Sequence, residues 1–316
     1  MPFSLRPAAP ADLPAIHALN RRIEINDKIP LVTPLEEFED WIDDPHLDFP
    51  RHTRVAVRNG DIVGYGRLWH RPSDTKESRV FLMGGVDPRH RQRGIGSALL
   101  AWQIEAGREL LSASPPDLKR YLRTMAYDFE QEAIALYEKH GLRAIRYYDE
   151  LLRPLDHLSG VTPIPDIELR PWDPGRTEEL RKTYNDAFAD HWGSTPLDEE
   201  AWAHRLGASG TRTDLSWIAL AGDEVVGLTL NAHYPADQEL TGRIDGWIMG
   251  LGTNRQFRKR GIASALVMQS CHTFRQQGFT HAALGVDSAS ATGADRIYRR
   301  LGFESMHRSI QHQMEV

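Results

Sequence analysis

The sequence predicts an α/β protein built as a tandem repeat of one domain, on three observations. The segment RQRGIGSALL at residues 91–100 returns as RKRGIASALV at residues 258–267, with the arginines, glycine, isoleucine, serine, alanine and leucine in register. A chain of 316 residues exceeds a typical single core and suits two domains of roughly 150 residues. Predicted strands and helices follow the same order in both halves, as expected for a duplicated domain.

Each half opens with an apolar/polar alternation that predicts a strand, at LRP 5–7 and again at LRP 169–171. A helix start follows, because TPLEE at 33–37 and TPLDE at 195–199 put proline at the first helical position and acids in the first turn. Next come RVAVRNGDIVGYGRLWH and WIALAGDEVVGLTLNAH. In each, a polar turn with glycine separates two runs of β-formers, which predicts two antiparallel strands.

The second part of each half contains the repeated motif. The apolar strands FLMGGV and WIMGLG lead into it, and a helix beginning SAL follows it. After a further strand, a helix with a tyrosine ends at a glycine in IALYEKHGL and in DRIYRRLGF, and a final pair of β segments closes the half. The stretch HLSGVTPIPDIE has two prolines, a glycine and no helical period. We therefore expect domains at 1–157 and 167–316, joined by a linker at 158–166.

Composition excludes several classes of function. The net charge of −6 argues against general nucleic-acid binding, which needs a clustered basic surface. The single cysteine, Cys271, excludes an intramolecular disulfide framework, and no His/Cys cluster has metal-ligand spacing, so we expect no metal. The N-terminus has no apolar signal region and no segment approaches eighteen consecutive apolar residues. We expect a cytoplasmic protein without membrane or nucleic-acid partners.

The repeated motif has the form Arg-x-x-Gly-x-(Gly/Ala) at a strand-to-helix junction. Backbone N–H groups at a helix start are unpaired and attract anions, and glycine lets an anion approach closely. A helix cap with exposed arginines is the plain alternative for one copy, but two copies with the same surroundings favour a diphosphate site. Walker and dinucleotide patterns do not fit the glycine spacing. The residues expected to contact the diphosphate are Arg91, Gln92, Arg93, Gly94, Ile95, Gly96 and Ser97, and Arg258, Lys259, Arg260, Gly261, Ile262, Ala263 and Ser264.

These motifs resemble the GNAT superfamily of CoA-dependent N-acetyltransferases, twice and over nearly the whole chain. The family's pyrophosphate motif matches residues 91–96 and 258–263, and its closing Leu-Tyr-x-x-x-Gly-Phe pattern matches 136–142 and 297–303. The resemblance implies two tandem domains, each a mixed, mostly antiparallel central sheet flanked by helices. It also implies acetyl-CoA as the acyl donor, with pantetheine along the preceding strand. The strand residues concerned are Gly84, Val86, Leu251 and Thr253.

Acetyl transfer to an amine needs a proton acceptor, an oxyanion donor and an acid for the thiolate. The resemblance implies a backbone oxyanion donor and points to Tyr137 and Tyr298 as acids. Many relatives carry glutamate in the fourth strand, where this chain has Val80 and Trp247. Asp245 lies on the same strand face as Trp247, so we take it as the substitute base.

The expected acceptor is a primary amine of a small molecule. In the C-terminal copy a loop carrying His191 and Trp192, together with His233, is expected to contact it. That copy is expected to be the catalytic one, because it combines this loop with Tyr298 and Asp245, and we expect a monomer or a homodimer. The missing strand-four acid keeps one alternative open, a non-catalytic acyl-CoA-binding regulatory or scaffold protein. Which amine is acetylated also stays open.

Overall fold

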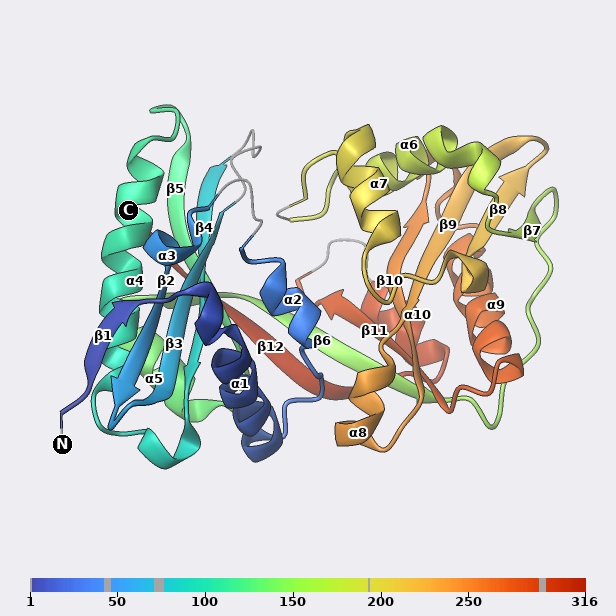
Figure 1. Ribbon diagram of the computed structural model, residues 1–316. Helices are drawn as coiled ribbons and strands as arrows, with labels where there is room; N and C mark the ends of the chain where they lie inside the picture. The colour runs from blue at the N-terminus through green and yellow to red at the C-terminus, as the bar shows by residue number, and fades with distance from the viewer. Residues whose placement is uncertain (1, 43–46, 71–76, 193, 290–293) are drawn as a thin grey trace. The chain divides into compact units, whose positions relative to one another are not determined.

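The computed structural model describes residues 2–42, 47–70, 77–192, 194–289 and 294–316, drawn as a ribbon in Figure 1. These residues fall into two compact units. Unit 1 comprises Met1–Tyr147, Glu239–Thr241 and Ser309–Val316, and unit 2 comprises Tyr148–Gln238 and Gly242–Arg308. Each unit therefore combines most of one half of the sequence with a short piece of the other half, a division that differs from the expected boundaries at 157 and 167.

The helices and strands follow the repeated order that the sequence predicts. The first half contains β1 (Ser4–Pro7), α1 (Leu13–Asp27), α2 (Leu35–Glu39), α3 (Phe49–His52), β2 (Thr53–Arg58), β3 (Asp61–His70), β4 (Glu77–Val86), α4 (Ile95–Ser112), β5 (Lys119–Tyr127), α5 (Gln131–Lys139) and β6 (Arg143–Pro154). The second half contains β7 (Glu168–Pro171), α6 (Thr177–Phe188), α7 (Glu199–Gly207), β8 (Trp217–Ala221), β9 (Glu224–His233), α8 (Gln238–Thr241), β10 (Asp245–Thr253), α9 (Ile262–Gln276), β11 (His281–Asp287), α10 (Ala294–Arg300) and β12 (Glu304–Glu315).

Among the described residues, each unit contains six strands, and the two sets of strands have the same order. In unit 1 the order is β1-β2-β3-β4-β5-β12, and in unit 2 it is β7-β8-β9-β10-β11-β6. Neighbouring strands pair antiparallel except for β4 with β5 and β10 with β11, which pair parallel. The predicted fold class, a mixed and mostly antiparallel sheet with flanking helices, is confirmed.

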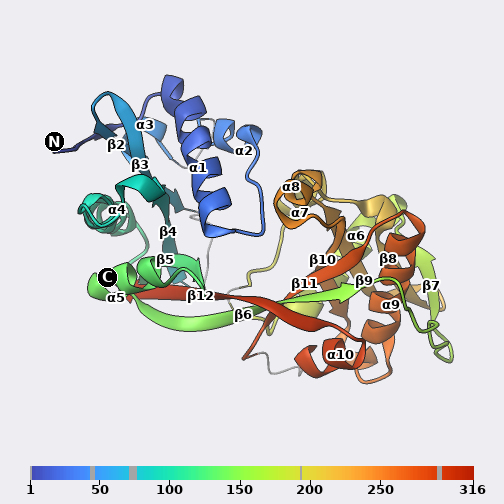
Figure 2. The ribbon, with the colours of Figure 1, turned by 90° about the horizontal axis from the view of Figure 1, so that it is seen from below.

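The last strand of each half completes the sheet of the other half's unit. Ser309–Glu315 of β12 pairs with Tyr121–Tyr127 of β5, as Figure 2 shows from below. Likewise, Tyr148–Pro154 of β6 pairs with β11. The prediction of a final pair of β segments was wrong, since β6 and β12 are each one strand of 12 residues. Each of these strands begins in one unit and ends in the other.

Helices cover both faces of each sheet because their apolar residues recur at helical spacing. In unit 1, α4 buries Leu100, Ile104 and Leu111 against one face, and α1 and α2 pack around Tyr65 on the other. In unit 2, α9 covers one face through Val267, Cys271 and Phe274, while α6 and α7 cover the other. The helices that begin at the repeated loops, α4 and α9, cover one face of each unit's strands. We call the opposite faces, under α1 and α6, the acceptor faces.

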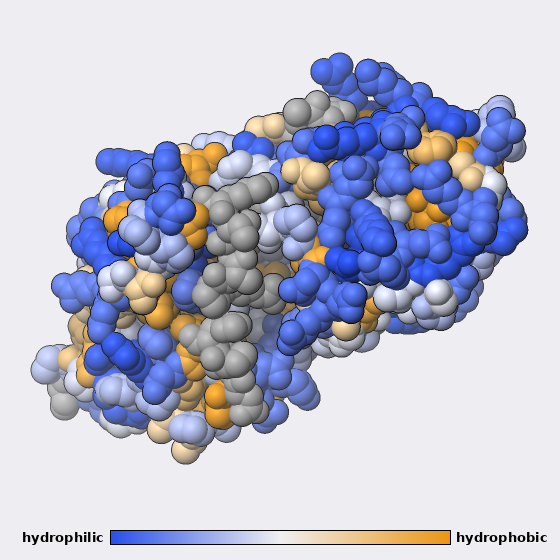
Figure 3. Space-filling model, turned by 90° about the horizontal axis from the view of Figure 1, so that it is seen from above, coloured by the Kyte–Doolittle hydropathy of each residue, from blue (hydrophilic) through white to orange (hydrophobic). Residues whose placement is uncertain are grey.

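The side seen in Figure 3 is coloured mainly hydrophilic, with hydrophobic residues scattered over it. Within the described ranges, no helix combines the length and the apolar character that a membrane span requires. Nor do any three His, Cys, Asp or Glu side chains of those ranges gather where they could hold a metal ion.

Candidate functional site

The repeated motif adopts the same backbone conformation in both units. Gln92 and Gly94 have φ of 57° and 82°, and Lys259 and Gly261 have φ of 64° and 89°. Left-handed φ is uncommon for residues other than glycine and concentrates at functional sites. Alternating left-handed residues aim successive N–H groups into one concavity, a known anion-binding arrangement. Gly94 and Gly261 are the N-caps of α4 and α9, so the helix dipoles add to this attraction.

The first arginine of each motif fixes the loop. Arg91 donates to the carbonyl oxygen of Val86 at 3.4 Å and to Asp27 of α1 at 2.8 Å. Arg258 donates to the carbonyl oxygens of Thr253 at 3.4 Å and Ala187 of α6 at 3.1 Å. Both guanidinium groups thus tie the end of a strand to the first long helix of the unit. Their side chains hold the loop in shape, and the expected direct contact with a diphosphate stays a prediction.

The remaining motif residues divide into exposed and buried side chains. Arg93, Lys259 and Arg260 are exposed, so their charges can meet an anion. Ile95 and Ile262 are each 1% exposed, so only their backbone amides are available. A Cβ added at Gly96 would lie 3.2 Å from Leu136 of α5, so the close approach of the two helices requires a small residue there. Ala263 stands at the matching place, and Ser97 and Ser264 follow in the first turn.

The strand that precedes each loop has an open edge. β4 pairs with β5 only from Glu77 to Phe81, so the residues around Gly84 and Val86 have no ladder partner on that side. β10 pairs with β11 only from Asp245 to Trp247, which leaves the edge around Leu251 and Thr253 open. Unpaired N–H and C=O groups on such an edge can bond an added extended chain. The family resemblance implies pantetheine at these residues, and its two amides suit such an edge.

One irregularity distinguishes the two open strands. The pairing of β10 with β9 shifts register between Ile248 and Gly250, so Met249 is an extra, bulged residue. The pairing of β4 with β3 runs from Gly64–Val86 to His70–Val80 without a shift. A bulge re-aims backbone groups locally and is common beside active sites. Only β10, of these two strands, therefore carries backbone N–H groups freed by a bulge at the point where the sheet opens.

The two tyrosines of the closing motif lie on the faces that α4 and α9 cover. Tyr298 of α10 is 7% exposed in a cluster with Leu151 and Leu284, and burial raises its pKa to about 12. Burial also raises the pKa of Tyr137, and a hydrogen bond with Thr124 partly offsets that effect. Both phenols therefore keep their protons at neutral pH. The ladder pairs Leu284 with Leu151 beside Tyr298, and Thr124 with His312 beside Tyr137.

Asp245 lies at the start of β10 and is already engaged. Its Oδ2 accepts hydrogen bonds from Arg243 at 3.1 Å and 2.9 Å, and its Oδ1 lies 3.9 Å from Nδ1 of His281. His281 is the ladder partner of Asp245 on β11, and burial lowers its imidazole pKa. A neutral imidazole accepts a proton more readily than a carboxylate held by a guanidinium. Sequence reasoning missed His281, because only the register between β10 and β11 places it beside Asp245.

The three residues expected to contact the acceptor are not gathered in one place. His233 is the ladder partner of Gly246, and an added Cβ at Gly246 would meet Phe274 of α9. The His233 ring packs against Phe279 at 4.7 Å between centroids, on the face opposite Asp245. His191 and Trp192 lie in the loop after α6, and the His191 ring packs against Phe188 at 5.8 Å between centroids. The loop after α6 is therefore better placed than His233 to meet an acceptor.

The acceptor faces of the two units differ at one equivalent position. Arg123 pairs with Phe81 in the β4–β5 ladder, and Ala283 pairs with Trp247 in the β10–β11 ladder. The Arg123 side chain is 1% exposed and donates to Glu77 at 2.9 Å and to Gln313 at 2.7 Å. A large buried side chain thus fills unit 1 where unit 2 has a methyl group. Two residues further along β11, a Cβ at Gly285 would meet no atom within 4 Å.

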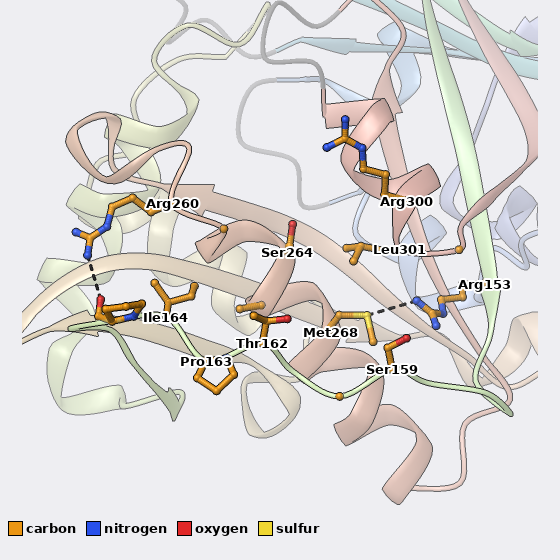
Figure 4. A pocket seen from close by; sticks show the side chains of 15 residues that line it. Arg153, Ser159, Thr162, Pro163, Ile164, Arg260, Ser264, Met268, Arg300 and Leu301 are labelled. Atoms are coloured by element: carbon orange, nitrogen blue, oxygen red, sulfur yellow. Dashed lines mark hydrogen bonds between the residues drawn. The ribbon is translucent and has the colours of Figure 1, made fainter.

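A cavity of about 610 Å³ lies beside the loop of unit 2 (Figure 4). It extends from Gly261 and Ser264 at the start of α9 to the end of α10 and to the segment that precedes β7. The lining residues are Arg153, Ser159, Gly160, Thr162, Pro163, Ile164, Pro165, Arg260, Gly261, Ser264, Ala265, Met268, Arg300, Leu301 and Gly302.

Comparisons with known proteins agree with this geometry. The family described as "Acetyltransferase (GNAT) family" matches residues 177–303, and "Acetyltransferase (GNAT) domain" matches residues 50–143. Among solved structures, a GCN5-related N-acetyltransferase from Sphaerobacter thermophilus has a TM-score of 0.79 at 27% identity and covers 99% of this chain and 95% of its own. A tandem GNAT protein from the clavulanic acid biosynthesis pathway has a TM-score of 0.69 at 15% identity over 99% and 98%, a likeness of fold.

Curated relatives extend the likeness to the sequence. A mycothiol acetyltransferase of Salinispora tropica is 30% identical over 280 residues, which cover 86% of this chain and 83% of that protein. A second, of Salinispora arenicola, is 28% identical over 85% and 83%. The two-domain layout had suggested mycothiol synthase as the analogue, and these relatives confirm that resemblance. With two matched domains, two copies of the loop and a curated relative along most of its length, this chain belongs to the GNAT family of N-acetyltransferases.

Proposed function

We propose that unit 2 transfers the acetyl group of acetyl-CoA to a primary amine of a small molecule, by direct attack of the amine on the thioester. The observation that carries the proposal is the open edge of β10, which runs directly into the left-handed loop at Gly261. An extended pantetheine on that edge would put its diphosphate at the N-terminus of α9 and its thioester where the sheet opens. Tyr298 lies in the buried cluster on the face of these strands that α9 covers.

The reaction then balances with groups of this unit. The amine nitrogen attacks the carbonyl carbon, a C–N bond forms, and the negative charge that develops on oxygen is met by backbone N–H groups at the Met249 bulge. When the C–S bond breaks, Tyr298 gives its proton to sulfur and regains one from solvent. Its raised pKa keeps the phenol protonated beforehand. The products are the acetamide and the CoA thiol.

The proton of the attacking amine has an acceptor on the same face. We assign that role to His281. Asp245 positions the imidazole and places a negative charge beside it. Asp245 and His281 lie two residues before Trp247, the last residue of β10 that pairs with β11, which is about 7 Å along the strand. One water can therefore pass the proton from the amine, where the strands separate, to His281. This assignment keeps Asp245 in the reaction while accounting for its bonds to Arg243.

Unit 1 is proposed to bind CoA without transferring its acetyl group. Its loop has the same backbone conformation as that of unit 2, and its strand edge is equally open. Arg123, however, occupies the acceptor face and is held there by Glu77 and Gln313. A cationic side chain in this place also disfavours an ammonium acceptor.

The test is turnover with a panel of amines. The full chain is incubated with acetyl-CoA and amino sugars, polyamines, amino acids or peptide N-termini, and CoA thiol release and acetylated product are measured. We expect at least one small amine to accelerate thiol release and to gain an acetyl group. If acetyl-CoA binds but no amine raises thiol release above the rate of hydrolysis, the transferase proposal fails for these acceptor classes. That result would favour the alternative, a non-catalytic acyl-CoA-binding protein.

A further inference from the structure

A second cavity of unit 2 lies where α6 meets the start of β9 and the turn that joins β10 to α9. Its volume is about 550 Å³, within the usual range for small-ligand sites. Four residues of α6, two of β9 and residues 254–257 of the turn line it, and none of them lines the cavity of Figure 4. The turn ends directly before Arg258, the first residue of the repeated motif, so a ligand held here would adjoin the CoA loop.

The duplication shows which residues of unit 1 hold the same place. Gly85 and Gly252 each stand six residues before the first arginine of the motif. A Cβ added at Gly85 would lie 2.5 Å from Ile23 of α1, and one at Gly252 would lie 2.8 Å from Ala187 of α6. Ile23 and Ala187 are therefore equivalent, and so are the residues that precede them on the two helices.

Those preceding residues, Arg22 and Asp186, differ in charge. In unit 1, Arg22 donates from Nε to Asp87 at 3.0 Å, and Arg89 donates to the same carboxylate at 2.7 Å. The counterpart of Asp87 is Asn254, since each stands four residues before the motif arginine. In unit 2, Asp186 and Asn254 both line the cavity. Unit 1 therefore fills, with guanidinium groups of its own, a place that adjoins a cavity in unit 2.

Two oxygen atoms of the lining can accept hydrogen bonds from a ligand. Asn254 donates from Nδ2 to the carbonyl oxygen of Val225 at 3.3 Å, and its Oδ1 is buried without a hydrogen-bond partner in the described part of the chain. Asp186 accepts from the backbone N–H of Arg255 at 3.1 Å through Oδ2, while its Oδ1 lies 4.0 Å from Nε of Arg255, beyond hydrogen-bond distance. A buried amide oxygen without a donor is costly, so a ligand that donates to it gains free energy on binding.

Charge in and around the cavity favours a cation. Three carboxylates and two cations line it, so the net charge of the lining is negative. Each of the two cations is already paired with a carboxylate outside the lining, Lys182 with Glu178 at 3.3 Å and Arg255 with Asp190 at 2.7 Å. Their charges are therefore largely offset, and a further cation near Asp186 is attracted rather than repelled.

We propose that this cavity binds a small guanidinium compound, which supplies to unit 2 the cation that Arg22 supplies to unit 1. The planar guanidinium with its several N–H donors suits a carboxylate beside an amide oxygen. Such a ligand would tie α6 to the turn before the CoA loop, where Arg258 already donates to the carbonyl oxygen of Ala187 at 3.1 Å. The ligand and CoA should therefore raise each other's affinity for unit 2. The inference rests on the proposed CoA site of unit 2 but not on acetyl transfer.

Calorimetric titration of CoA into the full chain tests this, with Gly94→Asp used throughout to silence the unit 1 loop. The probe is methylguanidinium, which has no aliphatic primary amine to acetylate, and sodium at the same ionic strength is the reference. Methylguanidinium should raise CoA affinity about fivefold, the lower end of typical coupling between two sites. Asp186→Asn should abolish the increase, because the carboxylate of the cavity is lost. An unchanged CoA affinity, an equal rise with methylammonium, or a rise that survives Asp186→Asn overturns the inference.

The ion pair of unit 1 provides matched variants in both directions. Asp186→Arg combined with Asn254→Asp copies that pair into unit 2 and should remove the response to methylguanidinium. In a chain whose unit 2 loop is silenced by Gly261→Asp, Arg22→Ala should weaken CoA at unit 1, and methylguanidinium should restore it. Thermal melts check that each variant is folded. A folded double variant that still responds to methylguanidinium overturns the inference.

Direct binding of methylguanidinium, measured by saturation-transfer NMR without CoA, separates the two proposals. If the cation binds and Asp186→Asn removes that binding while CoA does not bind unit 2, the proposed function fails and the cation site stands. If CoA binds unit 2 and methylguanidinium shows no binding that Asp186→Asn removes, the cation site fails and the proposed function stands.

Discussion

Replacing Gly261 by aspartate should remove CoA from unit 2 without unfolding it. Gly261 has φ of 89°, a left-handed conformation that aspartate tolerates better than most residues. The added Cβ would lie 3.8 Å from Ile164, an ordinary van der Waals contact. The folding cost is therefore about 1 kcal/mol, small beside a typical stability of about 5–15 kcal/mol.

The effect on binding is larger because two terms add. A carboxylate about 5 Å from one charge of a diphosphate, at an effective dielectric constant of about 20–40, is repelled by about 2–3 kcal/mol. The side chain also fills the space through which the anion approaches the backbone amides. Since about 1.4 kcal/mol corresponds to tenfold, CoA affinity should fall by a factor of at least about 30–150.

Calorimetry measures this loss directly, with Gly94→Asp as the matched variant in unit 1. The unchanged chain should bind two CoA per chain, and each single variant should bind one. A thermal melt of each variant checks that the fold is kept. If Gly261→Asp still binds two CoA with unchanged affinity, the diphosphate does not sit on this loop and the site is misplaced.

Three further predictions follow from named contacts. Because burial lowers the pKa of His281 from its ordinary value and the base must be neutral, kcat should rise with pH through that lowered pKa and then level, and His281→Gln should remove this acid limb from the pH–rate profile. Arg123→Ala should cost unit 1 about 1.5–3 kcal/mol in urea unfolding, because the hydrogen bonds of its buried guanidinium to Glu77 and Gln313 are lost while Glu77 keeps Arg79; an unchanged midpoint would contradict the assigned contact. Deleting Ser309–Val316 removes the edge strand of unit 1, so its CoA site should be lost in calorimetry while that of unit 2 persists.

The position of the loops before α4 and α9 was predictable because the residues that set their geometry lie within them. Gly94 and Gly261 are the residues that a left-handed N-cap favours, and the arginines around them repeat with the same spacing. The loop conformation is therefore specified by residues within the loop and does not depend on how distant strands pair. The order of strands and helices was predictable for the same reason, since each element has its own period and its own end signals.

The exchange of β6 and β12 was not predictable from the sequence. Because the domain is duplicated, β5 and β11 offer nearly equivalent edges, and a final strand with alternating residues fits either one. Whether the final strand pairs with the edge strand of its own half or of the other half produces no signal in the local sequence. The ladder of Ser309–Glu315 with β5, like that of Tyr148–Pro154 with β11, reveals the choice. It also brings His312 and Gln313 from the end of the chain into unit 1.

The acceptor side was predicted only in part, because it depends on register between strands. Asp245 could be placed on a face by periodicity, but its neighbour His281 lies 36 residues away and becomes visible only through the parallel β10–β11 pairing. His233 was expected to contact the acceptor, and the register pairs it with Gly246, on the face opposite Asp245. The Met249 bulge is likewise invisible in the sequence, since no glycine or proline stands at that residue.

The most direct test of the account compares Tyr298→Phe with Tyr137→Phe in acetyl transfer to an amine that the chain accepts. Each variant removes one buried hydroxyl and keeps the ring, so CoA affinity should change little in either. If Tyr298 is the acid, its loss should lower kcat by a factor on the order of 10² or more, whereas Tyr137→Phe should leave turnover nearly intact. Loss of turnover in Tyr137→Phe with full activity in Tyr298→Phe would contradict the assignment and move the catalytic site to unit 1.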